Sequence, residues 1–435
     1  MKKILILGVF IFITLSGNGL CSEGPPLAPK ISTYFSDSDI LKSFSRNTNP
    51  NIKPGTIPSK DGSFGIVFPE TKIIGDQGSR MGCSVSISGD YFVVGAPQDN
   101  IIGISSGSAR IYEHESGTGW VCVKQLVPCD GGNGDSFGTS VAIFGDYAIV
   151  GAYHDDGIHG YRSGSAYIYE RNGSGNWNFI SKLFASDGET NDEFGTTVAI
   201  SGDYAIVGAP AKNLWHGAIY VFKRDALGNW SEDAKLLSGS SMDMVLGSSI
   251  SISGDYVAAG VASGVDKVII YKRSAAVWAL HSQITDLWNS YTHLRCAISG
   301  DYLIVGTPFG MNGGNPHGAA YIYKRNGTEW IAQTTFLPNS GDDNFGQSVF
   351  ISGNYAIVGS REASIFARHV ENWHEVTRQS TDFPGDMFGS SVSLSEKHFV
   401  AGAPHDWASG PFSGAVYIYK NIIQKHNVQK KPAIE

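Results

Sequence analysis

The stretch from Phe194 to Ala209 reads FGTTVAISGDYAIVGA and holds the pattern that decides the fold. Two short runs rich in apolar and β-branched residues, 198–200 and 204–208, flank the turn Ser201-Gly202-Asp203. Such runs are typical of strands, and a central Gly-Asp pair suits the positive backbone angles of a tight hairpin. The stretch therefore predicts two antiparallel strands joined by a short turn.

The same unit recurs seven times along the chain. Four copies open with Phe-Gly, at Phe137, Phe194, Phe345 and Phe388, and degraded copies open at Met81-Gly82, Leu246-Gly247 and Thr292-His293. The opening glycine and the glycine of the closing Gly-Ala lie 13 residues apart in each copy, whereas the spacing between copies varies from 43 to 57 residues. A rigid hairpin is therefore embedded among variable loops.

Each hairpin is followed by a variable loop and by two further predicted strands. The third strand carries alternating aromatic residues, as in Tyr167-Ile168-Tyr169, and a turn such as Arg171-Asn172-Gly173 leads to the fourth. The fourth strand opens at a tryptophan in six copies: Trp120, Trp177, Trp230, Trp278, Trp330 and Trp373. Four antiparallel strands per repeat are typical of a propeller blade. The sequence thus predicts an all-β protein, a seven-bladed β-propeller of four-stranded antiparallel blades.

The ends of the repeat array predict how the ring closes. The seventh copy ends its third strand at Tyr419 with no Trp strand after it, while Phe64 to Ile74 precedes the first copy at the spacing of a fourth strand. We therefore expect this N-terminal strand to complete the last blade, which removes an open sheet edge. The expected organisation is a signal peptide at 1–21, a flexible linker at 22–60, the propeller at 61–423 and a basic polar tail at 424–435.

These repeats resemble the FG-GAP repeats of the integrin alpha-chain propeller, and more closely those of bacterial exported proteins with seven such repeats. The resemblance covers about 360 of the 435 residues. It implies a seven-bladed propeller that binds its ligands on the top face. That face is formed by the loops between the second and third strands and between the fourth strand and the next blade's first.

The chain departs from the integrin pattern in its acidic residues. Integrin-type repeats often carry an Asp-rich calcium loop between the two anchors, but here each turn holds one carboxylate, at Asp90, Asp146, Asp203, Asp255 and Asp301. Because Ca²⁺ takes roughly six to eight oxygen ligands, we expect these residues to be turn formers and expect no cofactor. A second acidic series, expected to cap loop amides, stands three residues before the opening glycine: Asp135, Asp192, Asp343 and Asp386.

The first 21 residues have the features of a secretory signal peptide. Lys2 and Lys3 precede the apolar run from Ile4 to Leu15, and small residues follow as far as Cys21. This run is too short to span a bilayer, so we expect a secreted, periplasmic or cell-surface protein without a transmembrane segment. A lipoprotein anchored through Cys21 is the alternative, although Leu20 stands where such signals have a small residue.

Charge and cysteine content narrow the range of partners and cross-links. Against 40 acidic residues the chain has 32 Lys and Arg, for a net charge of −8, which argues against a nucleic-acid binder. Beyond the leader it has Cys83, Cys122, Cys129 and Cys296. Export permits disulfides, but the sequence specifies no pairing, and buried free thiols are the favoured interpretation.

The loops between second and third strands hold more aromatic and polar side chains than the repeat requires. Aromatic faces beside Asp, His and Arg suit a sugar ring or a protein partner, since stacking supplies apolar contact while polar groups fix orientation. The candidate ligand-binding residues are Tyr153, His154, Asp155, Asp156, His159, Tyr161, Arg162, Trp215, His216, Phe309, His317, His405, Asp406 and Trp407. The spacing of His154, Asp155 and His159 matches no familiar zinc or calcium pattern, so no metal site is expected there.

Together these features predict an exported, monomeric, non-enzymatic binding protein that recognises a carbohydrate or a cell-surface protein in surface adhesion. The alternative is an exported propeller enzyme, a hydrolase or lyase acting on a polysaccharide or small ester. Catalytic residues of propellers converge near the central channel without forming a linear motif, so the sequence assigns none. A purely structural module is a third possibility.

Overall fold

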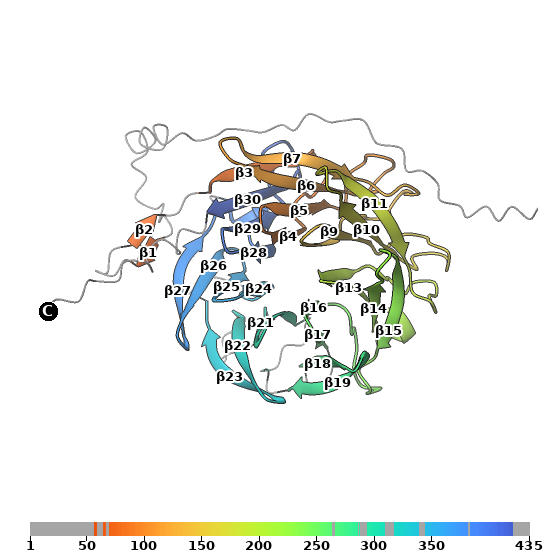
Figure 1. Cartoon of the computed structure of the whole chain (residues 1–435). Helices are drawn as coiled ribbons and strands as arrows, with labels where there is room; N and C mark the ends of the chain where they lie inside the picture. The colour runs from red at the N-terminus through yellow and green to blue at the C-terminus, as the bar shows by residue number, and fades with distance from the viewer. Residues whose placement is uncertain are drawn as a thin grey trace, which may run out of the picture.

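The computed structural model describes residues 69–262, 266–285, 287, 294–308, 317–338, 344–381 and 383–420, with the backbone of 56–58 and 64–66. In this part of the chain, seven four-stranded antiparallel sheets form a ring around a central axis (Figure 1). The hairpin that opens each repeat supplies the two inner strands, and the last strand of the repeat lies outermost. The predicted seven-bladed β-propeller is therefore confirmed.

The blades follow the chain, and their strands run from the innermost to the outermost. Blades 1 and 2 are β4 (Ser84–Ser88), β5 (Tyr91–Ala96), β6 (Ser108–Glu115) and β7 (Gly119–Leu126), then β8 (Ser140–Phe144), β9 (Tyr147–Ala152), β10 (Ser165–Arg171) and β11 (Trp177–Leu183). Blades 3 and 4 are β12 (Thr197–Ser201), β13 (Tyr204–Ala209), β14 (Ala218–Arg224) and β15 (Trp230–Leu236), then β16 (Ile250–Ser253), β17 (Tyr256–Val261), β18 (Lys267–Ser274) and β19 (Val277–Ile284). Blades 5 and 6 are β20 (Arg295–Ser299), β21 (Tyr302–Thr307), β22 (Ala319–Asn326) and β23 (Glu329–Phe336), then β24 (Ser348–Ser352), β25 (Tyr355–Gly359), β26 (Ala363–His369) and β27 (Asn372–Gln379).

Blade 7 joins the two ends of the repeat array. It consists of β28 (Ser391–Leu394), β29 (His398–Ala403), β30 (Ala415–Lys420) and, outermost, the N-terminal strand β3 (Thr71–Ile74). The predicted closure is confirmed, but the closing strand is shorter than the expected 64–74. Residues 64–66 form β2 (Phe64–Ile66), which pairs instead with β1 (Thr56–Pro58), inside the segment expected to be a linker.

Two short helical segments lie in the described loops. They are α2 (Lys212–Trp215), whose residues Asn213 and Leu214 have left-handed backbone angles, and the 3₁₀ turn η1 (Pro384–Asp386). Within the described residues, no helix has the length and apolar character needed to cross a membrane.

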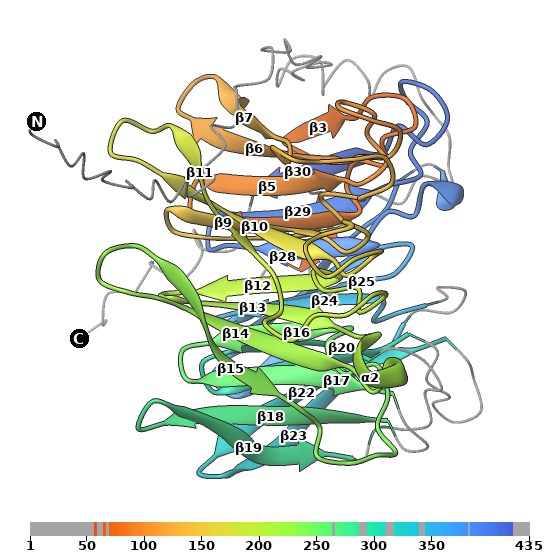
Figure 2. The same cartoon turned by 90° about the vertical axis from the view of Figure 1, so that its right-hand side faces the viewer.

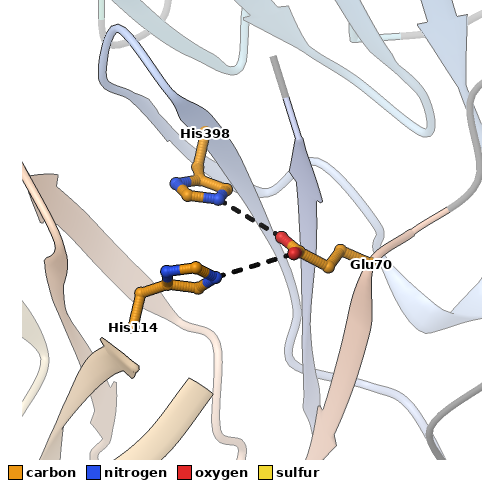
Figure 3. Close-up of side chains that lie close together, drawn as sticks. All are labelled: Glu70, His114 and His398. Atoms are coloured by element: carbon orange, nitrogen blue, oxygen red, sulfur yellow. Dashed lines mark ion pairs between the residues drawn. The ribbon is translucent and has the colours of Figure 1, made fainter. Parts of the chain in front are cut away.

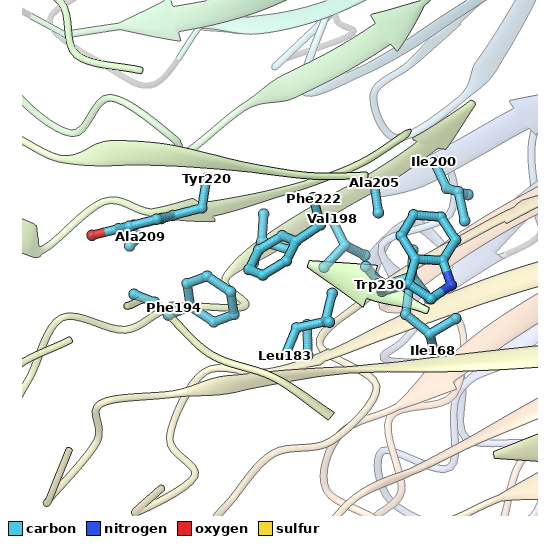
Figure 4. Close-up of a cluster of buried hydrophobic side chains, with 14 of the residues drawn as sticks. Ile168, Leu183, Phe194, Val198, Ile200, Ala205, Ala209, Tyr220, Phe222 and Trp230 are labelled. Carbon is cyan, nitrogen blue, oxygen red and sulfur yellow. The ribbon is translucent and has the colours of Figure 1, made fainter. Parts of the chain in front are cut away.

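The core is divided among the seven joints between blades. Each joint holds its own buried cluster, and Figure 4 shows the one between blades 2 and 3, where Ile168 and Leu183 face Val198 and Phe222. The apolar residue of the opening anchor, Phe194 in this joint, is fully buried. Because every cluster takes side chains from two blades, no blade buries its apolar surface alone.

The anchor glycines are required because the backbones of adjacent blades touch there. In blade 2 the Gly138 N–H donates to the Gly151 carbonyl, 2.9 Å away, within one hairpin. A Cβ atom on Gly151 would lie 2.0 Å from the carbonyl oxygen of Gly195 in blade 3. The same approach, 2.2 Å or less, occurs at five further closing glycines: Gly95, Gly208, Gly306, Gly359 and Gly402. The constant 13-residue spacing thus places the opening and closing glycines of one hairpin opposite each other. The closing glycine is the point where the backbone of the next blade makes contact.

Serine side chains link the innermost strands of neighbouring blades. Between blades 1 and 2, the N–H groups of Val141 and Ile143 donate to the hydroxyl oxygens of Ser84 and Ser86. The same bonds join blades 4 and 5 and blades 7 and 1. The alternating serines of stretches such as SVSIS therefore satisfy backbone donors on the inner edge of the next sheet, which would otherwise be unpaired.

A second repeated contact joins the blades nearer their outer side. Between blades 1 and 2, the guanidinium of Arg171 lies over the ring of Tyr91 at 4.3 Å, and Trp177 meets that ring edge-on at 6.0 Å. Arg171 also pairs with Asp146 of its own blade's turn. We call this arrangement the Tyr–Arg–Trp clamp. It recurs at the next four joints with Arg224, Arg273, Arg325 and Arg368.

Both acidic series predicted from the sequence have structural contacts. In the Gly-Asp turns only the glycine takes a positive φ, such as 59° at Gly202, as in a II′ turn. Four of the aspartates form an ion pair with the clamp arginine of their own blade. Asp135, Asp192 and Asp386 accept bonds from loop N–H groups, which confirms their predicted capping role, while Asp343 lies outside the described residues.

The four described cysteines are free. Cys296 is buried, and burial raises the pKa of its thiol to about 11. Cys83 and Cys122 are half-buried, whereas Cys129 is exposed. The interpretation as buried free thiols is therefore confirmed for Cys296 and wrong for Cys129, which lies in the loop after the fourth strand of blade 1 rather than in a joint.

The glycine contact makes a stability prediction. Gly151→Ala should lower the free energy of unfolding by about 2 kcal/mol or more, because the new methyl group forces blades 2 and 3 apart. Gly173→Ala is the matched control, since a Cβ there meets nothing within 4 Å and the backbone needs no positive φ. Denaturant unfolding of both variants measures the difference, and equal stability would contradict the steric explanation.

Candidate functional site

The loops that carry the candidate residues gather at one end of the ring. Figure 2 shows them on the right, near α2, while the hairpins joining the third and fourth strands project to the left. This end is the expected top face. It combines loops between second and third strands with loops between the fourth strand and the next blade.

Paired residues with left-handed backbone angles lie on this face at four joints. In each pair one residue comes from the loop before a third strand and the other directly precedes the opening anchor of the next blade, and their φ angles lie between 50° and 70°. The N–H of the second residue donates to the carbonyl of the first, at 2.6–3.2 Å. We call them the rim pairs: Ser105/Ser136, Arg162/Glu193, Trp215/Val245 and Phe412/Arg80.

The rim pairs keep one backbone geometry with different side chains. Left-handed angles are unfavourable for residues other than glycine by about 1–2 kcal/mol, so the surrounding structure must hold them. The hydrogen bond within each pair is followed by another, such as that from the Phe194 N–H to the Ser163 carbonyl, which docks the loop on the buried anchor. The frame is therefore constant, while the displayed side chains are charged, aromatic, aliphatic or small.

The second-to-third-strand loop of blade 2 places the rings of two residues next to the rim pair Arg162/Glu193. The rings of Tyr153 and His154 lie 3.7 Å apart, close to Arg162 and Glu193. Burial, with a smaller effect of Glu193, raises the pKa of Tyr153, while burial and the charge of Arg162 lower the pKa of His154. Both shifts favour the neutral forms of the two rings. Burial raises the pKa of the Glu193 carboxyl, and the positive charge of Arg162 acts in the opposite direction.

Blade 7 forms an aromatic cluster at the joint with blade 1. Phe412 lies 5.1 Å from the ring of His405 and 5.7 Å from that of Trp407, and the guanidinium of Arg80 stands 5.3 Å from the same phenyl ring. Burial, with a contribution from Arg80, lowers the pKa of His405. Trp407 is 62% exposed, so the indole ring of this cluster is open to solvent.

Two of the candidate aspartates are buried beneath the top face and already have partners. The Asp155 carboxylate lies 2.6 Å from the Lys182 ammonium and accepts a bond from the Tyr167 hydroxyl. Asp406 makes the equivalent contacts with Lys72 and Tyr417. In blade 3 the corresponding residue is a buried lysine, Lys212, which pairs with Asp192 at 2.9 Å. Lys182 and Lys72 hold the loops of blades 2 and 7 on their own blades, whereas Lys212 ties its loop to the segment that connects blades 2 and 3.

The other candidates are spread around the face. Asp156 accepts a bond from the Arg162 N–H, and the Arg162 guanidinium stands 5.2 Å from the exposed Tyr161 ring. His159 packs against Phe184, and the Nδ1 of His216 lies 2.9 Å from the carbonyl oxygen of Asp243. His317 is half-buried, and Phe309 lies outside the described residues.

Exposed apolar side chains are concentrated in the same loops. Most of the large ones in the described part of the chain are found there: Ile102, Ile104, Ile158, Tyr161, Phe184, Leu214, Trp215, Leu237, Met242, Met244, Leu337, Phe383, Met387, Trp407 and Phe412. The turns between third and fourth strands, at the opposite end, carry Leu227 and Val370. Exposed apolar side chains gathered on one face are typical of an interaction surface.

Sequence reasoning found Arg162 and Trp215 but missed the other six residues of the rim pairs. Arg80, Ser136, Glu193 and Val245 each stand directly before an opening anchor. The signal that could have found them is a position that differs in every copy beside one that is apolar in six of the seven copies.

The left-handed backbone before the opening anchor predicts opposite changes in stability when Val and Asn are exchanged between two blades. Val245 (φ 53°) and Asn344 (φ 67°) occupy the same position in two blades, and Asn tolerates left-handed angles better than a β-branched residue. Val245→Asn should raise the free energy of unfolding by about 1 kcal/mol, and Asn344→Val should lower it by a similar amount. Thermal or denaturant unfolding tests this, and shifts of equal sign would contradict the explanation.

Comparison with known proteins agrees with this architecture. The family model described as FG-GAP repeat matches residues 75–112, 120–169, 177–222 and 383–419. These matches fall on blades 1, 2, 3 and 7 with the anchors that lead into them. A search of curated proteins finds no match to this chain. The chain thus carries FG-GAP repeats in four places and folds as a seven-bladed β-propeller.

Proposed function

We propose that this propeller is an exported, non-enzymatic binding protein that recognises a protein partner through its top face. The observation that carries the proposal is the set of rim pairs. One strained backbone frame recurs at four joints, but its side chains change from charged to aromatic to aliphatic. A frame needed for the fold alone gives no reason for this variety, whereas a recognition surface needs chemically distinct groups at fixed places.

The exposed side chains favour a protein over the carbohydrate that the sequence equally allowed. Sugar sites combine aromatic faces with polar groups, which Trp407 and His405 also supply. However, Leu214 is 90% exposed and Met242 75% exposed, and such aliphatic side chains suit an apolar protein patch. Trp and Arg, represented here by Trp215 and Arg162, are also enriched among residues that dominate binding energy at protein interfaces.

The location and the biological role are part of the same proposal. The leader at residues 1–21 supports export, and a partner on a cell surface would make the protein an adhesion factor. The alternative of an exported propeller enzyme remains a prediction from the sequence.

The test is binding of the labelled purified chain to cells of the producing organism after two pretreatments. Protease digestion of the cell surface should abolish saturable binding, while periodate oxidation of surface sugars should leave it intact. Trp215→Ala and Arg162→Ala should each weaken binding about tenfold or more, as expected for central anchors of an interface.

Matched controls come from the opposite side of the molecule. Leu227→Ala and Val277→Ala remove exposed apolar side chains from β14–β15 and β18–β19 and should bind as the wild type does. Binding lost on periodate treatment and kept after protease would replace the protein partner by a glycan. Equal effects of top-face and control variants would overturn the proposed surface.

A further inference from the structure

The joint between blades 7 and 1, where the ring closes, departs from the Tyr–Arg–Trp clamp found at five other joints. At the position of the clamp tyrosine, blade 7 has His398, and at the position of the clamp arginine, blade 1 has His114. Trp120 keeps the position of the clamp tryptophan and meets both imidazole rings edge-on at 5.1 Å. Two side chains that ligate metals thus replace the two that form the cation–π contact at five joints.

A carboxylate completes this group of side chains. Glu70 directly precedes β3, and its N–H donates to the Ile418 carbonyl, so the closing strand positions it. Figure 3 shows its two oxygens directed at the two rings: one lies 3.2 Å from Nε2 of His398 and the other 3.6 Å from Nε2 of His114. Glu70 lies just before the N-terminal β3, His398 in β29 of blade 7 and His114 in β6 of blade 1.

The donor set and its spacing fit a transition-metal ion. The three possible ligand atoms lie within 4.8 Å of one another. In a tetrahedral zinc site, with bonds of about 2.0–2.2 Å, ligand atoms are separated by about 3.4 Å, so small side-chain rotations suffice. Imidazole suits zinc and related metals, whereas Ca²⁺ and Mg²⁺ prefer oxygen ligands alone.

The surroundings also suit a bound ion. His398 is only 2% exposed, and apart from its contact with Glu70 neither of its ring nitrogens has a hydrogen-bond partner among the described residues. Trp120, itself buried, walls one side. Glu70 and His114 keep about a quarter of their side chains exposed, which leaves a route from solvent.

We propose that Glu70, His114 and His398 bind one divalent transition-metal ion of the zinc type, which fastens the N-terminal closing strand to blades 7 and 1. Three protein ligands leave a fourth position for water. At the joint between blades 7 and 1 the ion takes the place of the Tyr–Arg–Trp clamp. Blade 7 contains strands from both ends of the repeat array. This site lies at the end of the ring opposite the top face and is independent of the proposed partner binding.

The decisive experiment is a zinc titration of the full chain after removal of metal with a chelator. Isothermal calorimetry and elemental analysis of the dialysed protein should give one zinc per chain. Glu70→Gln should weaken zinc binding about tenfold or more. Cobalt(II) in the same site should show the strong visible absorption of tetrahedral coordination, a signature that an ion pair without metal does not produce.

A double variant separates loss of metal from loss of folding. His114→Arg with His398→Tyr restores the side chains of the regular clamp, so it should fold and yet bind no zinc. His374→Ala, which removes an exposed histidine on β27, should bind zinc as the wild type does. Zinc should raise the Tm of the wild type by about 3 °C at 100 times Kd and leave that of the double variant unchanged.

Two results would overturn the proposal. One is a wild type that takes up no more zinc than the double variant, in which case the three residues form an ion-pair network only. The other is one equivalent of zinc that survives both Glu70→Gln and the double variant, which would place the ion elsewhere in the chain.

Discussion

The close approach of glycine backbones between adjacent blades is the constraint on which the rest of the structure depends. The closing glycine of one blade lies so near the opening glycine of the next that a Cβ atom at Gly95 would stand 1.8 Å from the Gly138 carbonyl oxygen. This contact sets the distance between neighbouring sheets. At that distance the serines of one inner strand reach the N–H groups of the next, and the apolar faces of two blades close over a shared cluster.

A ring held in this way can keep unfavourable backbone angles in its loops. The rim pairs are docked by consecutive hydrogen bonds next to a fully buried anchor, so their left-handed conformation is imposed by the frame and not by their own preference. Side chains there are free to vary because the backbone does not rely on them. The buried pairs at Asp155, Asp406 and Lys212 also hold the loops in place, the first two on their own blades and the third on the segment that connects blades 2 and 3.

The closing blade is the one blade of the ring that is not built from four consecutive strands of the chain. Blade 7 takes its outer strand from the N-terminal side of the array, so the joint with blade 1 must hold strands from both ends of the propeller. The regular clamp is missing there, and His398, His114 and Glu70 occupy the place. A metal ion that binds all three would make closure depend on a ligand, while the five joints from blade 1 to blade 6 depend on packing and cation–π contacts.

The sequence by itself determined the hairpin unit, the number of blades and the source of the closing strand, because each of these is a local pattern repeated at known spacing. It also indicated the loops of the top face, since they depart from the repeat, and among them Tyr153, His154, Arg162 and Trp215. Only the tertiary structure decided which side chains meet. Glu193 lies close to Arg162 across a joint, and Glu70 meets His398 from the other end of the array, because ring geometry brings together residues that are far apart in the sequence. Burial likewise could not be read from the loops: Asp155 and Asp406 resemble binding residues in sequence, yet their charges are neutralised by lysines of the neighbouring strands.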